Sequence, residues 1–189
     1  VRDAEPALVY ALGLTHVYGE PSRAKALLAR AHHAFAAAGD TRHAMLAAED
    51  KRFFSHGGID LLAIARAAWD NARTGKIVSG ASTIHQQLIK NATPRSGRRT
   101  FGVKLTEALQ ARRLAMSWSR EDVLAAYLSR ISFGNNMTGI TTAASGYFHK
   151  PLGDLTPAEC ALLAALPQSP TRWNPFREVK SILPRQRAI

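Results

Sequence analysis

The sequence predicts an all-α fold, and three observations lead to this prediction. Apolar residues recur at helical spacing along most of the 189-residue chain. The alternation of apolar and polar residues that is typical of strands is nearly absent. Two of the apolar stretches are preceded by residues with the spacing of a helix cap. With 46% hydrophobic residues, the chain can also close one good-sized core.

Three segments in the first half of the chain have helical character. An apolar run at 44–48 ends at Glu49. A helical pattern of apolar residues begins after Asp60 and continues to residue 68. Residues 80–90 lead from small residues into hydroxyls, which is where a further helix could begin.

The second half contains three further predicted helices. The apolar spacing over 105–116 predicts the first of them. Residues 119–122 have capping-box spacing and precede a single apolar stripe that extends to Ile131. Residues 156–159 combine a capping threonine, a proline at the first helical position and a glutamate three residues after the cap. Pro167 then ends the apolar run that follows.

Between these helices, we expect mobile loops at 74–81 and 91–102, where glycine or proline replaces the periodic apolar residues. No Pro/Ser-rich linker divides the chain, so we interpret 1–189 as a single domain. The chain starts at Val1 without a methionine and stops after the basic stretch 185–187. We therefore expect a domain excised from a longer protein.

The composition limits the kind of partner. Twenty-five Lys and Arg against 14 Asp and Glu give a net charge of +11, which indicates nucleic acid, an acidic lipid surface or a phosphorylated substrate. No nucleic-acid-binding motif is present, so we expect no nucleic-acid partner. The single cysteine, Cys160, excludes an internal disulfide and a multi-cysteine zinc site, and the seven histidines lack metal-binding spacing. The sequence contains no run of 18 uncharged apolar residues, which is the length that could span a membrane.

Two acidic residues are candidates for chemistry. Glu49 lies between an apolar helix face and Phe53 and Phe54, and a carboxylate in such surroundings can have its pKa raised by desolvation, as a general acid or base requires. The alternative is a helix-end salt bridge to the neighbouring Lys51 or Arg52. Two carboxylates on separate helices are the minimum apparatus for glycosyl chemistry.

The second acid is Glu107, for which an i, i+3 pair with Lys104 is the alternative. Residues 80–90 read GASTIHQQLIK, so free backbone N–H groups and hydroxyls at a helix start would face an anion. The Gly-Lys-Ser/Thr order of a P-loop is missing, and a simple capped helix is the alternative interpretation.

Five ordered blocks resemble the signatures of the peptidoglycan glycosyltransferases, the lysozyme-like domain of class A penicillin-binding proteins and of monofunctional enzymes. The blocks are 49–60, 80–91, Lys104 with Glu107, 121–134 and 139–175. The region of resemblance extends over roughly residues 45–175, whereas the first 40 residues, which we expect to be helical, match little. The resemblance implies a lysozyme-like, two-lobed helical domain.

The resemblance also implies the reaction. The 4-hydroxyl of a lipid II acceptor attacks the anomeric carbon of a lipid-linked glycan, with inversion and release of undecaprenyl pyrophosphate. By the same resemblance, Glu49 is the catalytic base and Glu107 acts at the donor site. The residues implied in binding pyrophosphate and sugar are Ser82, Gln86, Gln87, Lys90, Arg99 and Lys104. No resident cofactor is implied with certainty, and a divalent cation, Mg²⁺ or Mn²⁺, at the pyrophosphate stays open.

The partners implied are lipid II, the lipid-linked glycan chain and a membrane surface, with a following transpeptidase domain left open. The location implied is the outer face of the bacterial cytoplasmic membrane, with the anchor outside this chain. One alternative is a peptidoglycan-cleaving lysozyme or lytic transglycosylase, and another is an inactive module that binds lipid II or polyanions. The chain departs from the usual family pattern at His85, Val103, Ala115 and Ser129.

The segment between the two acids supplies more apolar bulk than a soluble lobe needs. Its large apolar residues are Leu61, Leu62, Ile64, Trp69, Ile77 and Val78. We expect part of this segment to enter the bilayer interface. Burial in the core of its own lobe is the alternative.

Overall fold

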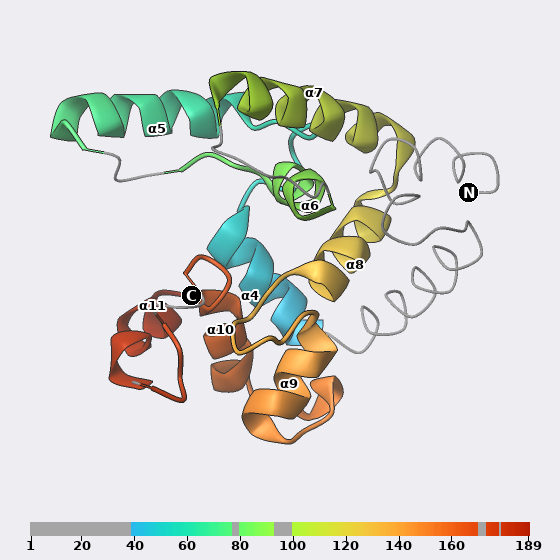
Figure 1. The fold of residues 1–189 in the computed structure, drawn as a ribbon, viewed down its shortest axis with the longest axis vertical. Helices are drawn as coiled ribbons and strands as arrows, with labels where there is room; N and C mark the ends of the chain where they lie inside the picture. Colours follow the sequence, from blue (N-terminus) through green and yellow to red (C-terminus); the bar gives the residue numbers. More distant parts are fainter. Residues whose placement is uncertain (1–38, 77–79, 93–99, 170–172, 178) are drawn as a thin grey trace.

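The all-α prediction is confirmed. The structure is a computed structural model that describes residues 39–76, 80–92, 100–169, 173–177 and 179–189. These residues form eight α-helices and no β-strand, apart from an isolated antiparallel bridge between Ser132 and Thr138 (Figure 1). Parts of the two predicted loops, 77–79 and 93–99, lie outside the described residues, as does Arg99.

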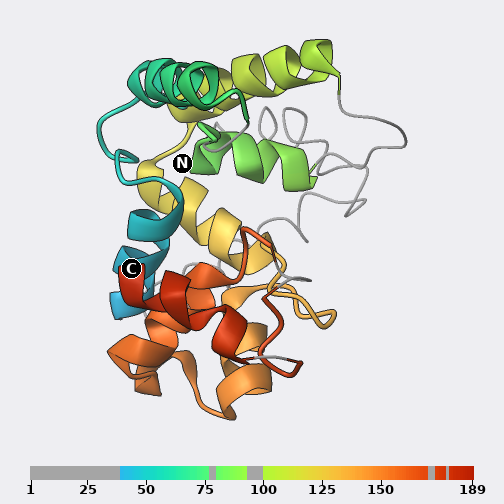
Figure 2. The ribbon, with the colours of Figure 1, turned by 90° about the vertical axis from the view of Figure 1, so that its left-hand side faces the viewer.

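The helices form two lobes, as the lysozyme-like interpretation predicts. Helices α5, α6 and α7 form the small lobe, drawn at the top of Figure 1, and α4, α9, α10 and α11 form the large lobe below it. Helix α8 connects the lobes, because it packs on α6 at one end and on α9 at the other. Figure 2 shows the same separation from the side. The bounds are α4 Gly39–Glu49, α5 Leu61–Thr74, α6 Ile84–Ala92, α7 Phe101–Ser117, α8 Arg120–Arg130, α9 Ile140–Phe148, α10 Pro157–Ala165 and α11 Leu183–Ala188, with short 3-10 turns at Leu152–Asp154 and Val179–Ser181.

Three helix starts follow from local cap chemistry and confirm the sequence analysis. The Asp60 side chain accepts a hydrogen bond from Ala63 N at 2.9 Å and begins α5. The Ser119 hydroxyl accepts from Asp122 N at 3.1 Å and begins α8. Thr156 begins α10 with a complete capping box. A cap of this kind contributes about 1 kcal/mol.

One continuous core holds the lobes together. Its largest fully buried side chains include Tyr127 of α8, Phe53 before α5 and Leu163 of α10. Helix α10 packs along α4, and α6 packs against both α7 and α8. The C-terminal end of α4 therefore reaches the junction of the lobes, next to the start of α6 (Figure 2).

The outer side of α5 is apolar and exposed. The exposed fractions are 73% for Leu61, 61% for Leu62, 41% for Ile64 and 70% for Trp69. Burial in the small lobe's own core is therefore wrong for these four residues, whereas Ile77 and Val78 lie outside the described residues. Within the described part of the chain, no helix has the length and apolar character needed to cross a membrane.

Candidate active site

Glu49 is the last residue of α4 and lies at the junction of the two lobes. Its side chain is 9% exposed. Gln87 Nε2, from α6, donates a hydrogen bond to Glu49 Oε2 at 3.0 Å. Arg185 Nη2, from α11, donates to Glu49 Oε1 at 3.3 Å. Each carboxylate oxygen is therefore held by a different helix.

The helix-end salt bridge considered for Glu49 is not the arrangement that the structure shows. Arg52 Nε forms its ion pair with Asp60 Oδ2 at 3.3 Å. The aromatic residues expected to surround the carboxylate also differ in their placement. Phe53 is buried and packs against the ring of His85, whereas Phe54 is 58% exposed. The groups that bond the carboxylate are polar.

The orientation of the Gln87 amide is set by Tyr127. The Tyr127 hydroxyl donates to Gln87 Oε1 at 3.2 Å. Burial, and then the charges of Glu49 and Asp50, raise the pKa of Tyr127 well above its usual value of 10.0, so the hydroxyl stays protonated and donates. With Oε1 facing Tyr127, the Nε2 group must face Glu49.

The neighbouring Asp50 joins the end of α4 to the start of α6. Its Oδ2 accepts from Ile84 N at 3.0 Å, and both of its oxygens lie 3.0 Å from His56 Nε2. Gly58 N donates to His56 Nδ1 at 3.2 Å, which places the proton of a neutral His56 ring on Nε2. Because Asp50 fixes α6 relative to α4, it also fixes Gln87 relative to Glu49.

Position 58 requires a glycine, both for its backbone conformation and for the space around it. It has a φ of +89°, and a Cβ atom there would lie 2.4 Å from the carbonyl oxygen of Ala111 in α7. Its own carbonyl accepts from the Thr83 hydroxyl at 2.7 Å. This close approach brings the turn after α4, the start of α6 and the middle of α7 together.

The start of α6 is a capped helix, the plainer of the two interpretations of residues 80–90. Thr83 N donates to Gln86 Oε1 at 3.0 Å, and Gln86 N donates to Thr83 Oγ1 at 3.2 Å. The amide of Ile84 is bonded to Asp50, so these backbone groups are already paired. A phosphate-binding role for Ser82, Gln86 and Gln87 stays a prediction.

His85, which departs from the usual family pattern, is part of the packed interior. It is 1% exposed, and its ring lies 5.2 Å from Phe53 and 5.6 Å from His56. Burial, followed by the charges of His56 and Arg120, lowers its pKa from 6.5 to about 4. The ring is therefore neutral at neutral pH.

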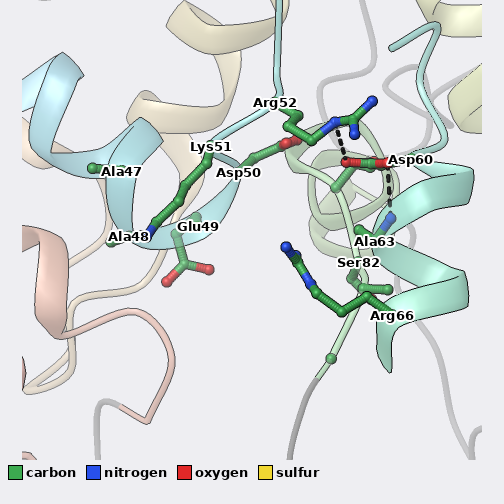
Figure 3. A pocket seen from close by; sticks show the side chains of 13 residues that line it. Ala47, Ala48, Glu49, Asp50, Lys51, Arg52, Asp60, Ala63, Arg66 and Ser82 are labelled. Atoms are coloured by element: carbon green, nitrogen blue, oxygen red, sulfur yellow. Dashed lines mark hydrogen bonds and ion pairs between the residues drawn. The ribbon is translucent and has the colours of Figure 1, made fainter. Parts of the chain in front are cut away.

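A pocket of about 210 Å³ opens beside Glu49. Figure 3 shows the Glu49 carboxylate on one side, with the Lys51 side chain extending beside it and the Arg66 guanidinium of α5 opposite. Ser82 lines the same pocket from the segment before α6. The pocket lining thus combines three acidic residues, Glu49, Asp50 and Asp60, with hydroxyl and cationic side chains.

The remaining predicted residues lie on α6 and α7, which pack against each other. Glu107 is 1% exposed within α7. Lys90, in the last turn of α6, and Lys104, in the first turn of α7, are both exposed. Their roles at the donor site stay predictions. The sequence analysis did not identify Arg185 or Tyr127. Arg185 lies in a basic stretch and Tyr127 in an apolar stripe, and neither pattern indicates a contact with Glu49.

The described residues contain no group of three or more His, Cys, Asp or Glu that could hold a metal ion. In the pocket beside Glu49, the three acidic residues Glu49, Asp50 and Asp60 are matched by the cations Lys51, Arg52 and Arg66. Cations suit an anionic ligand and repel a divalent metal. The donor set in the described structure does not fit a resident metal ion.

Comparison of the sequence with known protein families agrees with the two-lobed helical fold and with the carboxylate at the lobe junction. A family model described as transglycosylase matches residues 29–189, and the chain belongs to that family. It is therefore a transglycosylase domain, that is, a glycosyltransferase enzyme.

Three relatives illustrate the similarity, and each is named penicillin-binding protein 1A. The protein of Neisseria gonorrhoeae is 43% identical over 148 residues, which is 78% of this chain and 18% of that protein. The protein of Neisseria flavescens is 44% identical over 135 residues, 71% of this chain and 17% of the relative. The protein of Aquifex aeolicus is 41% identical over 147 residues, 78% of this chain and 20% of the relative. The chain therefore spans about a fifth of the length of these relatives.

Proposed function

We propose that this domain polymerises lipid II into glycan strands, with Glu49 as the general base. The observation that carries the proposal is the Glu49 carboxylate, which is nearly buried, held on both oxygens and open to a pocket whose lining includes Lys51, Arg52 and Arg66. Groups positioned in this way supply catalytic geometry before the substrate arrives.

In the proposed step, Glu49 takes the proton of the acceptor's 4-hydroxyl. The hydroxyl oxygen forms a bond to the anomeric carbon of the donor as the bond from that carbon to the pyrophosphate breaks. The leaving undecaprenyl pyrophosphate keeps the electron pair, and the configuration inverts. The bonds from Gln87 and Arg185 occupy two of about four acceptor positions of the carboxylate, so positions are left for this proton.

Charge on the leaving group increases during the step, and cations stabilise it there. Lys51 and Arg66 lie at the pocket, and Lys90 and Lys104 are exposed on the neighbouring helices. We propose that these cations, with Arg99, Ser82 and Gln86, bind the pyrophosphate and sugar. The net charge of +11 supports an anionic substrate.

Glu107 has a different proposed role. Because it is 1% exposed inside α7, it would act on the donor site by ordering that helix and its cations rather than by taking the substrate proton. Its conversion to glutamine is then expected to affect donor binding as well as rate.

Peptidoglycan synthesis is an activity of the cell envelope, and we propose that the domain acts at the outer face of the cytoplasmic membrane. The exposed apolar residues of α5 support contact with the bilayer interface, because such side chains gain free energy there. The names of the relatives support a parent protein that also carries a transpeptidase domain.

We further propose that a divalent cation, Mg²⁺ or Mn²⁺, would be a partner of the substrate's pyrophosphate and not a resident metal. This placement is supported by the described residues, which contain no group of three or more His, Cys, Asp or Glu that could hold a metal ion. Elemental analysis of the purified chain is expected to find much less than one bound metal ion per molecule. A stoichiometric metal that survives dialysis against EDTA would contradict the proposal.

The function is tested by incubating the chain with lipid II in detergent and sizing the products. Long glycan is expected from the unaltered chain. Glu49→Gln is expected to fold normally and to lose about 10² to 10⁴ in rate, the usual value of general-base assistance. Fragments released from a sacculus would instead indicate a lysozyme or lytic transglycosylase. Binding of lipid II without any turnover would indicate a binding module.

A further inference from the structure

Arg185 is fixed at the lobe junction by three separate contacts. Its Nη2 group donates to Glu49 Oε1 at 3.3 Å, and its Nε group donates to the carbonyl oxygen of Ala165 at 3.2 Å. The guanidinium carbon lies 5.2 Å from the centre of the Trp173 ring, within the range of a cation–π contact. The side chain is 23% exposed, so it is neither a free surface arginine nor a fully buried one.

The helix that carries Arg185 is anchored on both sides of it. Ile182, which precedes α11, is completely buried in the core. Gln186 Nε2 donates to the carbonyl oxygen of Ala158 in α10 at 2.7 Å. Because both anchors belong to the large lobe, α11 presents Arg185 to Glu49 from a fixed direction.

We propose that Arg185 is a positioning residue for the reaction, which holds the Glu49 carboxylate in the orientation that faces the acceptor. The inference rests on the proposed function, since it gives Arg185 its role through Glu49. Gln87 holds one carboxylate oxygen from the small lobe, and Arg185 holds the other from the large lobe. Together they fix the plane of the carboxylate, which a single bond would leave free to turn.

This position requires the planar, forked arrangement of N–H donors that a guanidinium provides. Arg185 Nε reaches the Ala165 carbonyl while Nη2 reaches Glu49, and the guanidinium carbon lies over the Trp173 ring. A lysine ammonium has no planar fork and stacks less well on an aromatic ring.

The test compares Arg185→Ala with Arg187→Ala, in which an exposed arginine of the same helix is lost with the same change of charge. Steady-state polymerisation of lipid II gives kcat and KM. For Arg185→Ala, we expect kcat to fall about tenfold to a hundredfold, as for other misplaced catalytic groups, with little change in KM.

Arg187→Ala should match the unaltered chain in both quantities, and Arg185→Lys, which keeps the charge without the planar fork, should restore part of kcat. Equal kcat in the two alanine variants would overturn the inference. So would a loss for Arg185→Ala that lies in KM alone. If circular dichroism shows that Arg185→Ala is unfolded, Arg185→Gln carries the same test, because it removes the charge and keeps a polar side chain.

Failure of this inference can be separated from failure of the proposed function. If Glu49→Gln stays active, the proposed function fails, whatever Arg185 does. If Glu49→Gln is inactive while Arg185→Ala has full kcat, only the role of Arg185 fails.

Discussion

The Tyr127 hydroxyl offers a selective way to disturb Glu49 without touching it. Tyr127→Phe removes the bond to Gln87 Oε1 and keeps the ring, which is completely buried in the core. The Gln87 amide then loses the contact that places its Nε2 group toward Glu49. A turned amide would put its oxygen against the carboxylate, which is repulsive.

Two magnitudes follow from this geometry. Loss of one buried hydroxyl bond, with its partner left unsatisfied, should lower the free energy of unfolding by about 1 to 3 kcal/mol. For a domain of this size, 1 kcal/mol corresponds to about 2–4 °C in Tm. We also expect kcat to fall about tenfold, since Glu49 keeps Arg185 but loses the fixed Gln87 contact.

Tyr147→Phe is the matched control. Its hydroxyl also donates one hydrogen bond, to the carbonyl oxygen of Phe133 at 2.8 Å, and it belongs to α9, away from the Glu49 contacts. This variant should lose stability and keep kcat. The assays are thermal unfolding by circular dichroism and lipid II polymerisation. If both variants lose stability and both keep full kcat, the orientation of Gln87 has no part in the chemistry.

Three further predictions concern pH, substrate charge and the membrane. Because the pKa of buried His85 is about 4 in the folded chain against 6.5 unfolded, unfolded chains bind the proton first as pH falls. The contribution of His85 to the free energy of unfolding is complete above pH 6.5 and decreases by about 3 kcal/mol as the pH falls to 4. In chemical denaturation, the free energy of unfolding of His85→Thr should therefore decrease less over the same pH range. Lys90→Ala should weaken donor use about tenfold to a hundredfold, while Lys180→Ala on an exposed 3-10 turn should not; equal activities would refute the phosphate role. Leu61→Ser combined with Trp69→Ser should reduce sedimentation with anionic vesicles, and unchanged binding would argue against insertion of α5.

Much of the fold could be predicted because its signals are local. Ser119 and Thr156 cap helices through atoms three residues away, and such spacing is visible in the sequence. The ordered signature blocks likewise indicated the family and Glu49. The exposure of α5 could not be assigned, because the same apolar residues suit a lobe core or a membrane surface.

The contacts that make Glu49 a candidate base depend on tertiary structure. Arg185 is 136 residues from Glu49 along the chain, and Gln87 is 38 residues away. Neither pairing follows from spacing, because the distance depends on how α4, α6 and α11 pack. The sequence by itself determined the helices, their caps and the family. Only the packing of the two lobes decided which cation and which amide hold the carboxylate, because hydrogen bonds require atoms within about 3 Å of each other and local patterns extend over only a few residues.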